Sequence, residues 1–244
     1  MIQIIYGRNA VLEWFYSGLS VTQILMTADM QMQTAQKMQE MARQRQIPVK
    51  TMNRQQLTQI AGSENHQGIA AKVTTPDYAE LEDLLLAAEN KQEKPFIAIL
   101  DGIQDPHNLG AIIRSADGAG VHGLVIPKDQ SVDLTPTVIK ASAGAAAHVP
   151  VVKATNIARL MDELKEKGFW ITGVDQEGDK NYAEADYTGA IALVLGSEGR
   201  GIRRLVREKC DFLVSIPMYG KVNSLNVSVA AALVFFEARK HKKQ

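Results

Sequence analysis

Five side chains between residues 108 and 226 of this 244-residue chain could hold or orient a reacting group. Amides, a hydroxyl and a guanidinium can bind a substrate hydroxyl or phosphate, whereas a carboxylate suits a neutral or cationic ligand better than an anionic one. Each of the five stands in, or shortly after, a polar or glycine-rich segment between elements expected from the sequence. The candidates are Asn108, Arg114, Glu198, Ser224 and Asn226.

The first segment, residues 101–110, is a polar loop that precedes an expected helix. Asn108 stands near the start of that helix and is typical of an N-cap, whose side chain binds free backbone N–H groups. Arg114 lies within the apolar helix and therefore needs an anionic partner. That partner is either a carboxylate of the chain, such as Asp101 or Asp117, or a phosphate of a ligand.

The second segment is the glycine-rich turn Gly196-Ser197-Glu198-Gly199-Arg200-Gly201, which follows an expected strand. Its glycines allow the backbone to approach a ligand closely. The spacing G-x-x-G-x-G differs from the dinucleotide fingerprint, which also needs an acidic residue about 20 positions later. Ile216-Pro217 stands there instead, so an NAD site is disfavoured. Glu198 would repel a phosphate, which favours a neutral or cationic ligand.

Four arginines with almost no acid between them begin at the end of this turn and continue along a helix expected at 202–209. Their spacing would place them on one helix face, opposite an apolar face made by Ile202, Leu205 and Val206. Such a face is either solvated or binds nucleic-acid phosphates, and both interpretations stay open. The arginines are Arg200, Arg203, Arg204 and Arg207.

The third segment, residues 216–228, leads into a final helix of small and apolar residues. Ser224 is typical of an N-cap for that helix, while Asn226 and Ser228 place polar groups where its apolar face begins. Capping with local side-chain hydrogen bonds is one interpretation of this polar cluster. A polar pocket is the other, and the sequence favours neither.

The elements that must position these residues are strands alternating with helices, which is typical of an α/β protein. We expect a mostly parallel sheet with helices on both faces, whose ligands bind at the carboxyl ends of the strands. Its strands are expected at 96–100, 124–127, 149–153, 169–174, 190–195 and 212–216, and its helices at 111–120, 137–147, 157–167, 202–209 and 225–239.

A smaller α/β unit is expected before this sheet, separated from it by an acidic stretch. Residues 76–95 contain six acidic and two basic residues, which suggests a linker. The predicted domains are therefore 1–75, the linker 76–95, and 96–244. The smaller unit has strands expected at 2–6, 21–27, 49–52 and 69–74, and helices at 9–17, at 34–46 and after the N-cap Asn53.

Composition excludes several classes of protein. With 45% hydrophobic and 22% charged residues the chain is an ordinary globular protein, and no apolar run is long enough to span a membrane. The start of the chain lacks the basic segment of a signal peptide. Cys210, as the single cysteine, excludes a disulfide within the chain and a multi-cysteine zinc site, and the histidines suggest no metal cluster. We therefore expect a cytoplasmic protein without a metal.

Taken together, the three segments resemble the signature motifs of the SpoU (TrmH-like) RNA 2′-O-ribose methyltransferases of the SPOUT superfamily. The resemblance covers residues 96–244 and rests on the motif residues and their order. Two further segments, Gly7-Arg8-Asn9-Ala10-Val11 and His66-Gln67-Gly68-Ile69, resemble the L7Ae/L30e-like RNA-binding extension of one branch of that family. That branch includes enzymes that methylate a guanosine of bacterial 23S rRNA, the large-subunit rRNA.

The resemblance implies an α/β SPOUT fold with a trefoil knot, a homodimer formed through the knotted domain, and S-adenosyl-L-methionine as the cofactor. It implies that Arg114 grips the ribose hydroxyl and the phosphate, while Asn108, Glu198, Ser224 and Asn226 orient Arg114 and the ribose. The residues expected to hold the cofactor are Leu195, Gly196, Gly201, Ile216, Met218 and Leu225. Those expected to bind RNA are Arg8, Asn9, His66, Arg200, Arg203, Arg204 and Arg207.

Three other functions remain possible from the sequence. A tRNA ribose 2′-O-methyltransferase would keep the fold and change the substrate, although the N-terminal extension favours rRNA. An RNA-binding relative that has lost catalysis is a second alternative, and the intact motif residues argue against it. A Rossmann-type nucleotide enzyme is the least favoured, because the acidic residue of its fingerprint is missing.

Overall fold

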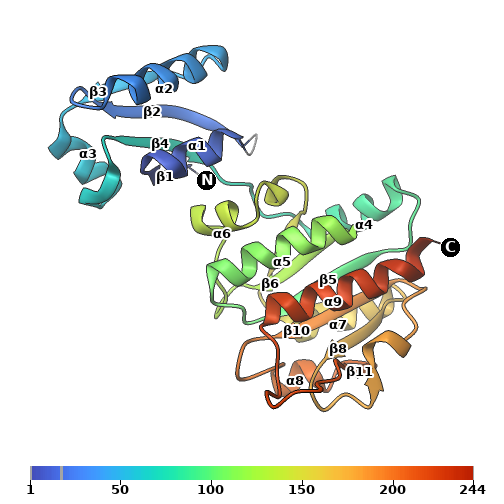
Figure 1. The fold of residues 1–244 in the computed structure, drawn as a ribbon. Helices are drawn as coiled ribbons and strands as arrows, with labels where there is room; N and C mark the ends of the chain where they lie inside the picture. Colours follow the sequence, from blue (N-terminus) through green and yellow to red (C-terminus); the bar gives the residue numbers. More distant parts are fainter. Residues whose placement is uncertain (1, 17–18, 244) are drawn as a thin grey trace. The chain divides into compact units, whose positions relative to one another are not determined.

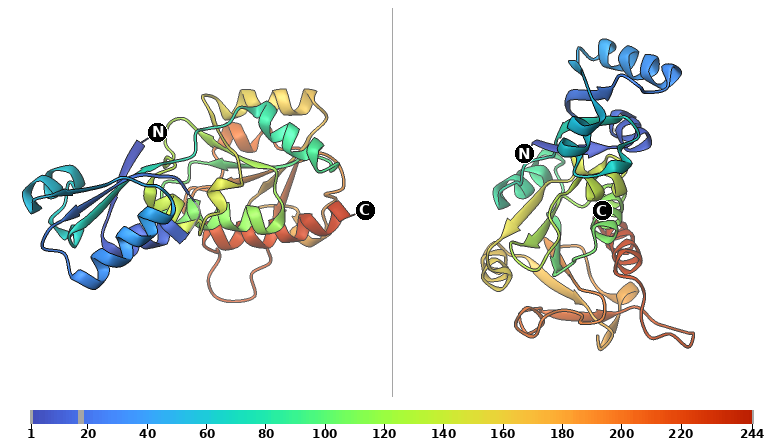
Figure 2. Two further views of the ribbon diagram at one scale, coloured as in Figure 1. Left: turned by 90° about the horizontal axis from the view of Figure 1, so that it is seen from above. Right: turned by 90° about the vertical axis from the view of Figure 1, so that its left-hand side faces the viewer.

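The computed structural model describes residues 2–16 and 19–243 and contains two compact units (Figures 1 and 2). The first unit comprises Met1–Asp77 and Leu134–Gly144, and the second comprises Tyr78–Asp133 and Ala145–Gln244. Both are α/β units, as the alternation of strands and helices predicts.

The first unit is built on a four-stranded sheet with the order β1-β4-β2-β3. Strand β4 runs antiparallel to β1 and β2, whereas β2 and β3 are parallel. The strands are β1 (Ile2–Tyr6), β2 (Val21–Thr27), β3 (Val49–Met52) and β4 (Ile69–Thr74), and the helices are α1 (Arg8–Tyr16), α2 (Met32–Gln44) and α3 (Arg54–Ala61). Ser17, the last residue expected in the first helix, lies outside the described residues.

The cap expected at the start of α3 is confirmed. The side chain of Asn53 accepts a hydrogen bond from the backbone N–H of Gln56 at 2.8 Å, and the Gln56 side chain accepts one from the Asn53 N–H. This capping box binds two of the N–H groups that a helix start leaves free. The helix ends at Gly62, which has the left-handed conformation that favours glycine.

The second unit contains a seven-stranded sheet in which every pair of neighbouring strands is parallel. Its order, β7-β6-β5-β10-β8-β11-β9, inserts β10 between two strands that precede it in the chain. Central strands are buried on both faces and are accordingly continuous apolar runs. The strands are β5 (Phe96–Asp101), β6 (Gly123–Pro127), β7 (Val151–Ala154), β8 (Trp170–Val174), β9 (Lys180–Asn181), β10 (Ile191–Gly196) and β11 (Phe212–Ser215).

Helices cover both faces of this sheet (Figure 2). On one face α5 (Pro106–Ala119) and α9 (Val227–Lys240) lie side by side. On the other face α4 (Leu81–Asn90) and α7 (Ile157–Glu166) pack their leucines, isoleucine and methionine against the strands in one apolar cluster. The remaining helices are α6 (Pro136–Ala141) and the single turn α8 (Arg204–Arg207).

The helix starts next to the candidate residues differ from those expected. Helix α5 begins at Pro106 after Asp105, whose side chain accepts from the His107 N–H at 2.9 Å, so Asn108 lies inside the helix and is not its N-cap. Proline is well suited to the first helical position because its missing N–H would be unpaired there. Likewise the N-cap of α9 is Asn226 and not Ser224.

The expected helix at 137–147 is interrupted. Helix α6 ends at Ala141, and a short 3₁₀ turn follows at Ala145–Ala147. Between them Ala143 and Gly144 have φ angles of 51° and 93°, which no α-helix contains. A run of small residues has good helix propensity, but it does not by itself reveal such a break.

The boundary expected at residues 76–95 is also corrected. Ala79 forms a bridge to Val152 at the edge of the large sheet, and Leu81 and Leu84 are buried in its core cluster. The acidic side chains face solvent while the apolar face of α4 packs on the sheet, so residues from Tyr78 onward belong to the second unit.

Candidate active site

A chain of hydrogen bonds links one residue from each of the three polar segments. The side-chain nitrogen of Asn226 donates to Asn108 Oδ1 at 2.9 Å and to Glu198 Oε1 at 2.5 Å. Its oxygen accepts from the backbone N–H of Ser228 at 2.9 Å, which fixes the amide at the start of α9. Three residues separated by up to 118 positions in the chain are thus held together.

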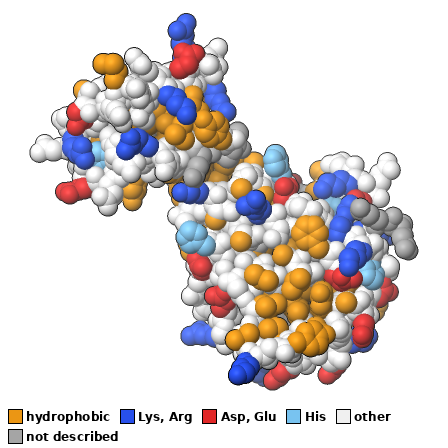
Figure 3. All heavy atoms as spheres, viewed as in Figure 1, with side chains coloured by type: hydrophobic (Ala, Val, Ile, Leu, Met, Phe, Trp, Pro, Cys, Tyr) orange, Lys and Arg blue, Asp and Glu red, His pale blue; other side chains and the backbone are white. Residues whose placement is uncertain are grey.

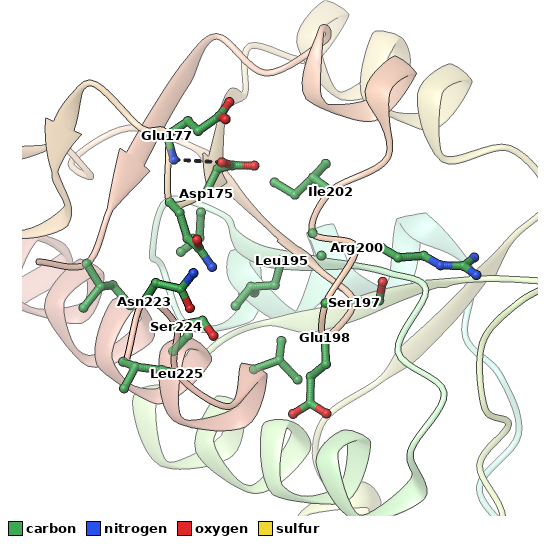
Figure 4. Close-up of a pocket in the computed structure, with 18 of the residues that line it drawn as sticks. Asp175, Glu177, Leu195, Ser197, Glu198, Arg200, Ile202, Asn223, Ser224 and Leu225 are labelled. Atoms are coloured by element: carbon green, nitrogen blue, oxygen red, sulfur yellow. Dashed lines mark hydrogen bonds between the residues drawn. The ribbon is translucent and has the colours of Figure 1, made fainter. Parts of the chain in front are cut away.

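The larger of two adjoining pockets near this link lies at the carboxyl ends of β8 and β10, where ligands of parallel sheets bind (Figure 4). Its volume is about 900 Å³. All six residues expected to hold the cofactor line it, as do Glu198, Ser224 and Asn226. The six are Leu195, Gly196, Gly201, Ile216, Met218 and Leu225.

The glycine-rich turn forms one wall of the larger pocket and requires glycine at specific positions. Ser197 and Gly201 form a bridge that folds the turn back on itself. A Cβ on Gly196 would lie 2.0 Å from the carbonyl carbon of Gly201, so no side chain fits there. Gly201 has a φ angle of 65°, the left-handed conformation that favours glycine.

Other lining residues were missed in the sequence. Val174 ends β8, the next three residues, Asp175, Gln176 and Glu177, follow it, and Asn223 precedes the start of α9. The Glu177 N–H donates to Asp175 Oδ1 at 2.9 Å, which fixes the local turn of this loop (Figure 4). The strand expected at 169–174 offered a signal, because its carboxyl end lies at the same edge of a parallel sheet as that of the strand at 190–195, but only the strand order makes the two neighbours.

The four arginines do not form the expected helix face. Arg203 is the N-cap of α8, and Leu205, expected to be buried, is 61% exposed. The Arg203 backbone N–H and Nε donate to the two oxygens of Asp101 at 2.8 and 2.7 Å. Arg207 contacts Glu177 at 2.9 Å and Arg204 contacts Glu208 at 3.1 Å.

These pairs show that carboxylates of the chain itself relieve much of the repulsion among the arginines, while the RNA contacts expected of these residues stay a prediction. Carboxylates from distant segments of the chain neutralise Arg203 and Arg207, and a neighbour on the same helix neutralises Arg204. Arg200, by contrast, forms no hydrogen bond or ion pair within the described part of the chain. Its side chain extends away from the labelled residues of the larger pocket (Figure 4).

Arg114 also differs from expectation. Asp101, one of its possible partners, is occupied by Arg203, and its side chain is fully buried. Arg114 is exposed on α5, lines neither pocket, and has no partner among residues 2–16 and 19–243. Of the five candidate catalytic residues, it alone lies outside the cluster around Asn226.

A smaller pocket of about 370 Å³ adjoins the larger one. Asn108 lines it, and Glu198 and Arg200 line both pockets. The wall between the two pockets therefore carries the hydrogen-bonded residues Asn108, Glu198 and Asn226.

In the first unit His66 is fully buried, which corrects its expected contact with RNA. Its Nδ1 accepts from the Gly68 N–H at 3.0 Å and its Nε2 lies 3.1 Å from Thr58 Oγ1, so both ring nitrogens are occupied. Arg8 and Asn9 lie at the start of α1, where Asn9 is exposed and Arg8 donates to Gln31 Oε1 at 3.3 Å. His66 thus shapes a turn and does not face solvent.

An apolar surface covers α9 and its surroundings (Figure 3). Val229, Leu233 and Phe236 of that helix are 48%, 39% and 52% exposed. Large apolar side chains gathered on one face of a helix are typical of a surface that contacts another protein.

The described residues lack both a membrane-spanning helix and a cluster of metal-ligating side chains. No helix there has the length and apolar character needed to cross a membrane. No group of three or more histidine, cysteine, aspartate or glutamate side chains in the same residues could hold a metal ion.

Comparisons with known proteins agree over nearly the whole chain. The SpoU rRNA methylase family matches residues 95–236, and the RNA 2′-O ribose methyltransferase substrate-binding domain matches residues 4–79. YacO of Bacillus subtilis (strain 168), named as a TrmH family tRNA/rRNA methyltransferase, is 47% identical over 233 residues, which are 96% of this chain and 93% of that protein.

Solved structures show the same relationship. The SpoU methyltransferase AviRb from Streptomyces viridochromogenes, crystallised with its cofactor AdoMet (S-adenosylmethionine), has a TM-score of 0.73 and 25% identity, over 98% of this chain and 90% of that chain. A TrmH/SpoU tRNA modifying enzyme of A. aeolicus has a TM-score of 0.55 and 30% identity, over 66% of this chain and 82% of that chain.

The expected family resemblance and cofactor are therefore confirmed. The chain belongs to the SpoU family of RNA methyltransferases, which use S-adenosylmethionine, and it carries the substrate-binding domain of RNA 2′-O-ribose methyltransferases at its N-terminal end.

Proposed function

We propose that this chain transfers a methyl group from S-adenosylmethionine to the ribose 2′-OH of a guanosine in bacterial 23S rRNA. The observation that carries the proposal is the hydrogen-bonded link Asn108–Asn226–Glu198 in the wall between two pockets. A transferase of this kind must hold a donor and an acceptor on either side of one small set of side chains.

The larger pocket is the proposed cofactor site, and its residues fit that ligand. Its volume suits a nucleoside-sized molecule, and Glu198 provides a carboxylate near which a sulfonium cation is favoured. The absence of a Cβ at Gly196 allows the Gly201 backbone to pack against it, and both glycines line the pocket, where their peptide groups are proposed to contact the ligand. When bound, S-adenosylmethionine supplies the electrophilic methyl group.

The residues of the shared wall are proposed to position the acceptor. A ribose hydroxyl is a weak nucleophile near neutral pH, so it must be oriented and its proton must be accepted or polarised. Asn226 fixes the positions of Asn108 and Glu198, while Ser224 lies beside it in the same pocket. Holding the hydroxyl in line with the methyl group contributes on the order of 7–11 kcal/mol in well-oriented reactions.

Arg114 is proposed to act in the site of a second copy of the chain. Its side chain is exposed on α5 and lines neither pocket of its own chain, while Gly118, one turn later, has Phe236 of the apolar surface within 3.4 Å of its ideal Cβ position. A homodimer formed through this surface would bury Val229, Leu233 and Phe236. The proposed trefoil knot belongs to the same domain.

The choice of rRNA is supported by the first unit. The A. aeolicus tRNA modifying enzyme covers only 66% of this chain, so a third of the chain has no counterpart in that enzyme. A substrate-binding domain of its own gives the chain a second RNA contact, and Arg8 and Asn9 are its proposed contact residues. We propose a cytoplasmic enzyme without a metal, with tRNA as the second candidate substrate.

The test supplies the purified protein with radiolabelled S-adenosylmethionine and either unmodified large-subunit rRNA or bulk tRNA transcript. Label in rRNA alone, mapped to one 2′-O-methylguanosine, is the expected result. Label in tRNA alone would show that tRNA, and not rRNA, is the substrate, while the proposed methyl transfer would stand. Cofactor binding measured by calorimetry, with no label in either RNA, would contradict both choices of substrate.

A further inference from the structure

The smaller pocket has features of a binding site in its own right. It lies beside the start of α5 and shares Ser197, Glu198 and Arg200 with the larger pocket. Asn108 faces it, and the Asn108 side-chain nitrogen has no hydrogen-bond partner within the described residues, whereas its oxygen is held by Asn226. A volume of about 370 Å³ falls within the range of sites for small ligands.

The polar groups of this pocket divide into those already paired and those still open. Asp101 is buried and occupied on both oxygens by Arg203, so it forms part of the floor. Asp105 is exposed, and only its Oδ1 is engaged, by the His107 N–H. Gln104 and Gln130 complete the rim and have no side-chain partner in the described parts of the chain.

Resting on the proposed function, we propose that the smaller pocket receives the acceptor nucleoside, with its base read by Asp105. The ribose lies at the shared wall beside Asn108 and Glu198, and Arg200 meets the adjoining phosphate. The base then points toward the rim, where the open carboxylate oxygen of Asp105 is the strongest hydrogen-bond acceptor.

This carboxylate selects guanine among the four bases. The Watson–Crick edge of guanine presents two adjacent donors, N1–H and the N2 amino group, which match the two oxygens of a carboxylate. Each carboxylate oxygen accepts two hydrogen bonds, so Oδ1 can hold both the His107 N–H and the base. The other three bases present at most one donor group on that edge beside acceptor atoms, and an acceptor atom facing a carboxylate is repelled.

The experiment compares Asp105→Asn with Asp129→Asn in the full chain. Asparagine caps a helix as well as aspartate does, so the start of α5 is preserved while one acceptor oxygen becomes a donor. Asp129 is an exposed neighbour of Gln130 that lines neither pocket, which makes it a control with the same change of charge. Each protein is assayed on a synthetic rRNA hairpin carrying guanosine or inosine at the methylated position, and inosine lacks the N2 amino group.

For Asp105→Asn we expect kcat/KM on guanosine RNA to fall about 10-fold to 100-fold, the usual cost of losing a bidentate base contact. For the wild-type protein, kcat/KM on inosine RNA is expected to be lower than on guanosine RNA by a similar factor. For Asp105→Asn, kcat/KM on inosine RNA is expected to be close to its already reduced value on guanosine RNA. RNA affinity in the presence of S-adenosylhomocysteine, measured by fluorescence anisotropy, follows the same pattern. Asp129→Asn stays at the wild-type level throughout.

Two results would overturn the proposal while the proposed function stands. The first is an Asp105→Asn protein that methylates guanosine RNA as well as Asp129→Asn does. The second is an equal loss on guanosine and inosine RNA together with a lower Tm, which would reduce Asp105 to a helix cap. Failure of the wild-type protein to methylate either hairpin, by contrast, contradicts the proposed function itself.

Discussion

At the scale of single residues, Asn226 connects the three polar segments. Its amide nitrogen uses both hydrogens, one toward Asn108 and one toward Glu198, while its oxygen caps α9. An aspartate in its place could keep the cap but could donate neither hydrogen bond. Substitution by aspartate can therefore separate the role of Asn226 as helix cap from its role in linking Asn108 and Glu198.

We predict that Asn226→Asp loses methyl transfer at least 100-fold while Tm stays close to the wild-type value, because the cap survives and a carboxylate now faces Glu198. Asn156 is the N-cap of α7 and lines neither pocket, so its substitution is the control for losing a helix cap away from the site. Asn156→Ala should cost about 1 kcal/mol of unfolding free energy and leave methyl transfer intact. Activity of Asn226→Asp within threefold of wild type would show that the link is only structural.

Arg200 differs from its neighbours in having no carboxylate partner in the described residues. We predict that Arg200→Ala weakens RNA binding and lowers the slope of log affinity against log salt by about one, as expected for one lost phosphate contact. Arg204→Ala, which removes a cation paired with Glu208, should leave that slope unchanged. Equal slopes of log affinity against log salt for Arg200→Ala and Arg204→Ala would show that Arg200 does not contact an RNA phosphate.

At the scale of elements, the strands were more predictable than the helix starts. Apolar runs rich in β-branched residues and leucine located β5 and β10, since both faces of these strands are buried. The start of α5 was misplaced because Asn108 and Asp105 are both good caps. Only the Pro106 that follows Asp105 distinguishes them, since proline suits the first helical position.

The same limit explains why the arginines were misinterpreted. Their spacing suggests one helix face, but α8 is a single turn, and the partners of Arg203 and Arg207 are 102 and 30 residues away in the chain. Contacts over such separations depend on the order of strands in the sheet, and β10 is inserted between earlier strands. Periodicity within one segment contains no information about that order.

The glycine-rich turn gives a prediction at this scale. Gly196→Ala would place a methyl group 2.0 Å from the Gly201 backbone, so the turn must open. We expect the Kd for S-adenosylmethionine, measured by calorimetry, to rise by about tenfold or more, since backbone groups that line the pocket are displaced and each factor of ten corresponds to about 1.4 kcal/mol of lost contacts. Gly220→Ala is the control, because a Cβ there meets nothing within 4 Å. An unchanged Kd for Gly196→Ala would contradict the assigned cofactor site.

At the scale of the whole molecule, the core of the second unit contains an acid-sensitive group. His122 is buried, its Nδ1 accepts from the Phe96 N–H at 3.0 Å, and its Nε2 lies 3.3 Å from Glu93. Burial lowers the pKa of His122 to about 4, with help from the cations of Lys91 and Arg239. The neutral ring is therefore the form that the folded protein holds.

The sign of the pH dependence follows from that shift. Between about pH 6.5 and pH 4, His122 is protonated in the unfolded chain, where its pKa is near 6.5, but stays neutral in the folded protein, where its pKa is about 4. We predict that stability is full above about pH 6.5 and falls as the pH drops toward 4. His122→Gln should flatten the change of Tm across this window, whereas exposed His148→Gln should not. A wild-type Tm that stays constant between these pH values would contradict the assignment.

Assembly from two copies is the remaining claim at this scale, and mixing two inactive variants tests it. Arg114→Ala is expected to lose turnover and keep cofactor binding. If Arg114 serves the site of a second copy, then a heterodimer with Asn226→Asp contains one intact site. Random mixing after partial denaturation should restore about a quarter of wild-type activity, since half the dimers are mixed and half their sites work. No recovery would place Arg114 in the site of its own chain or exclude the dimer.

In the proposed reaction the residues around Asn226 direct a methyl group to a ribose 2′-oxygen. The most direct measurement is mass spectrometry of nucleosides from 23S rRNA that was incubated with deuterated-methyl S-adenosylmethionine and either the wild-type protein or Asn226→Asp. We predict deuterated 2′-O-methylguanosine at one position with the wild-type protein and none with the variant. A labelled methyl group on a base, or equal labelling by both proteins, would contradict this account.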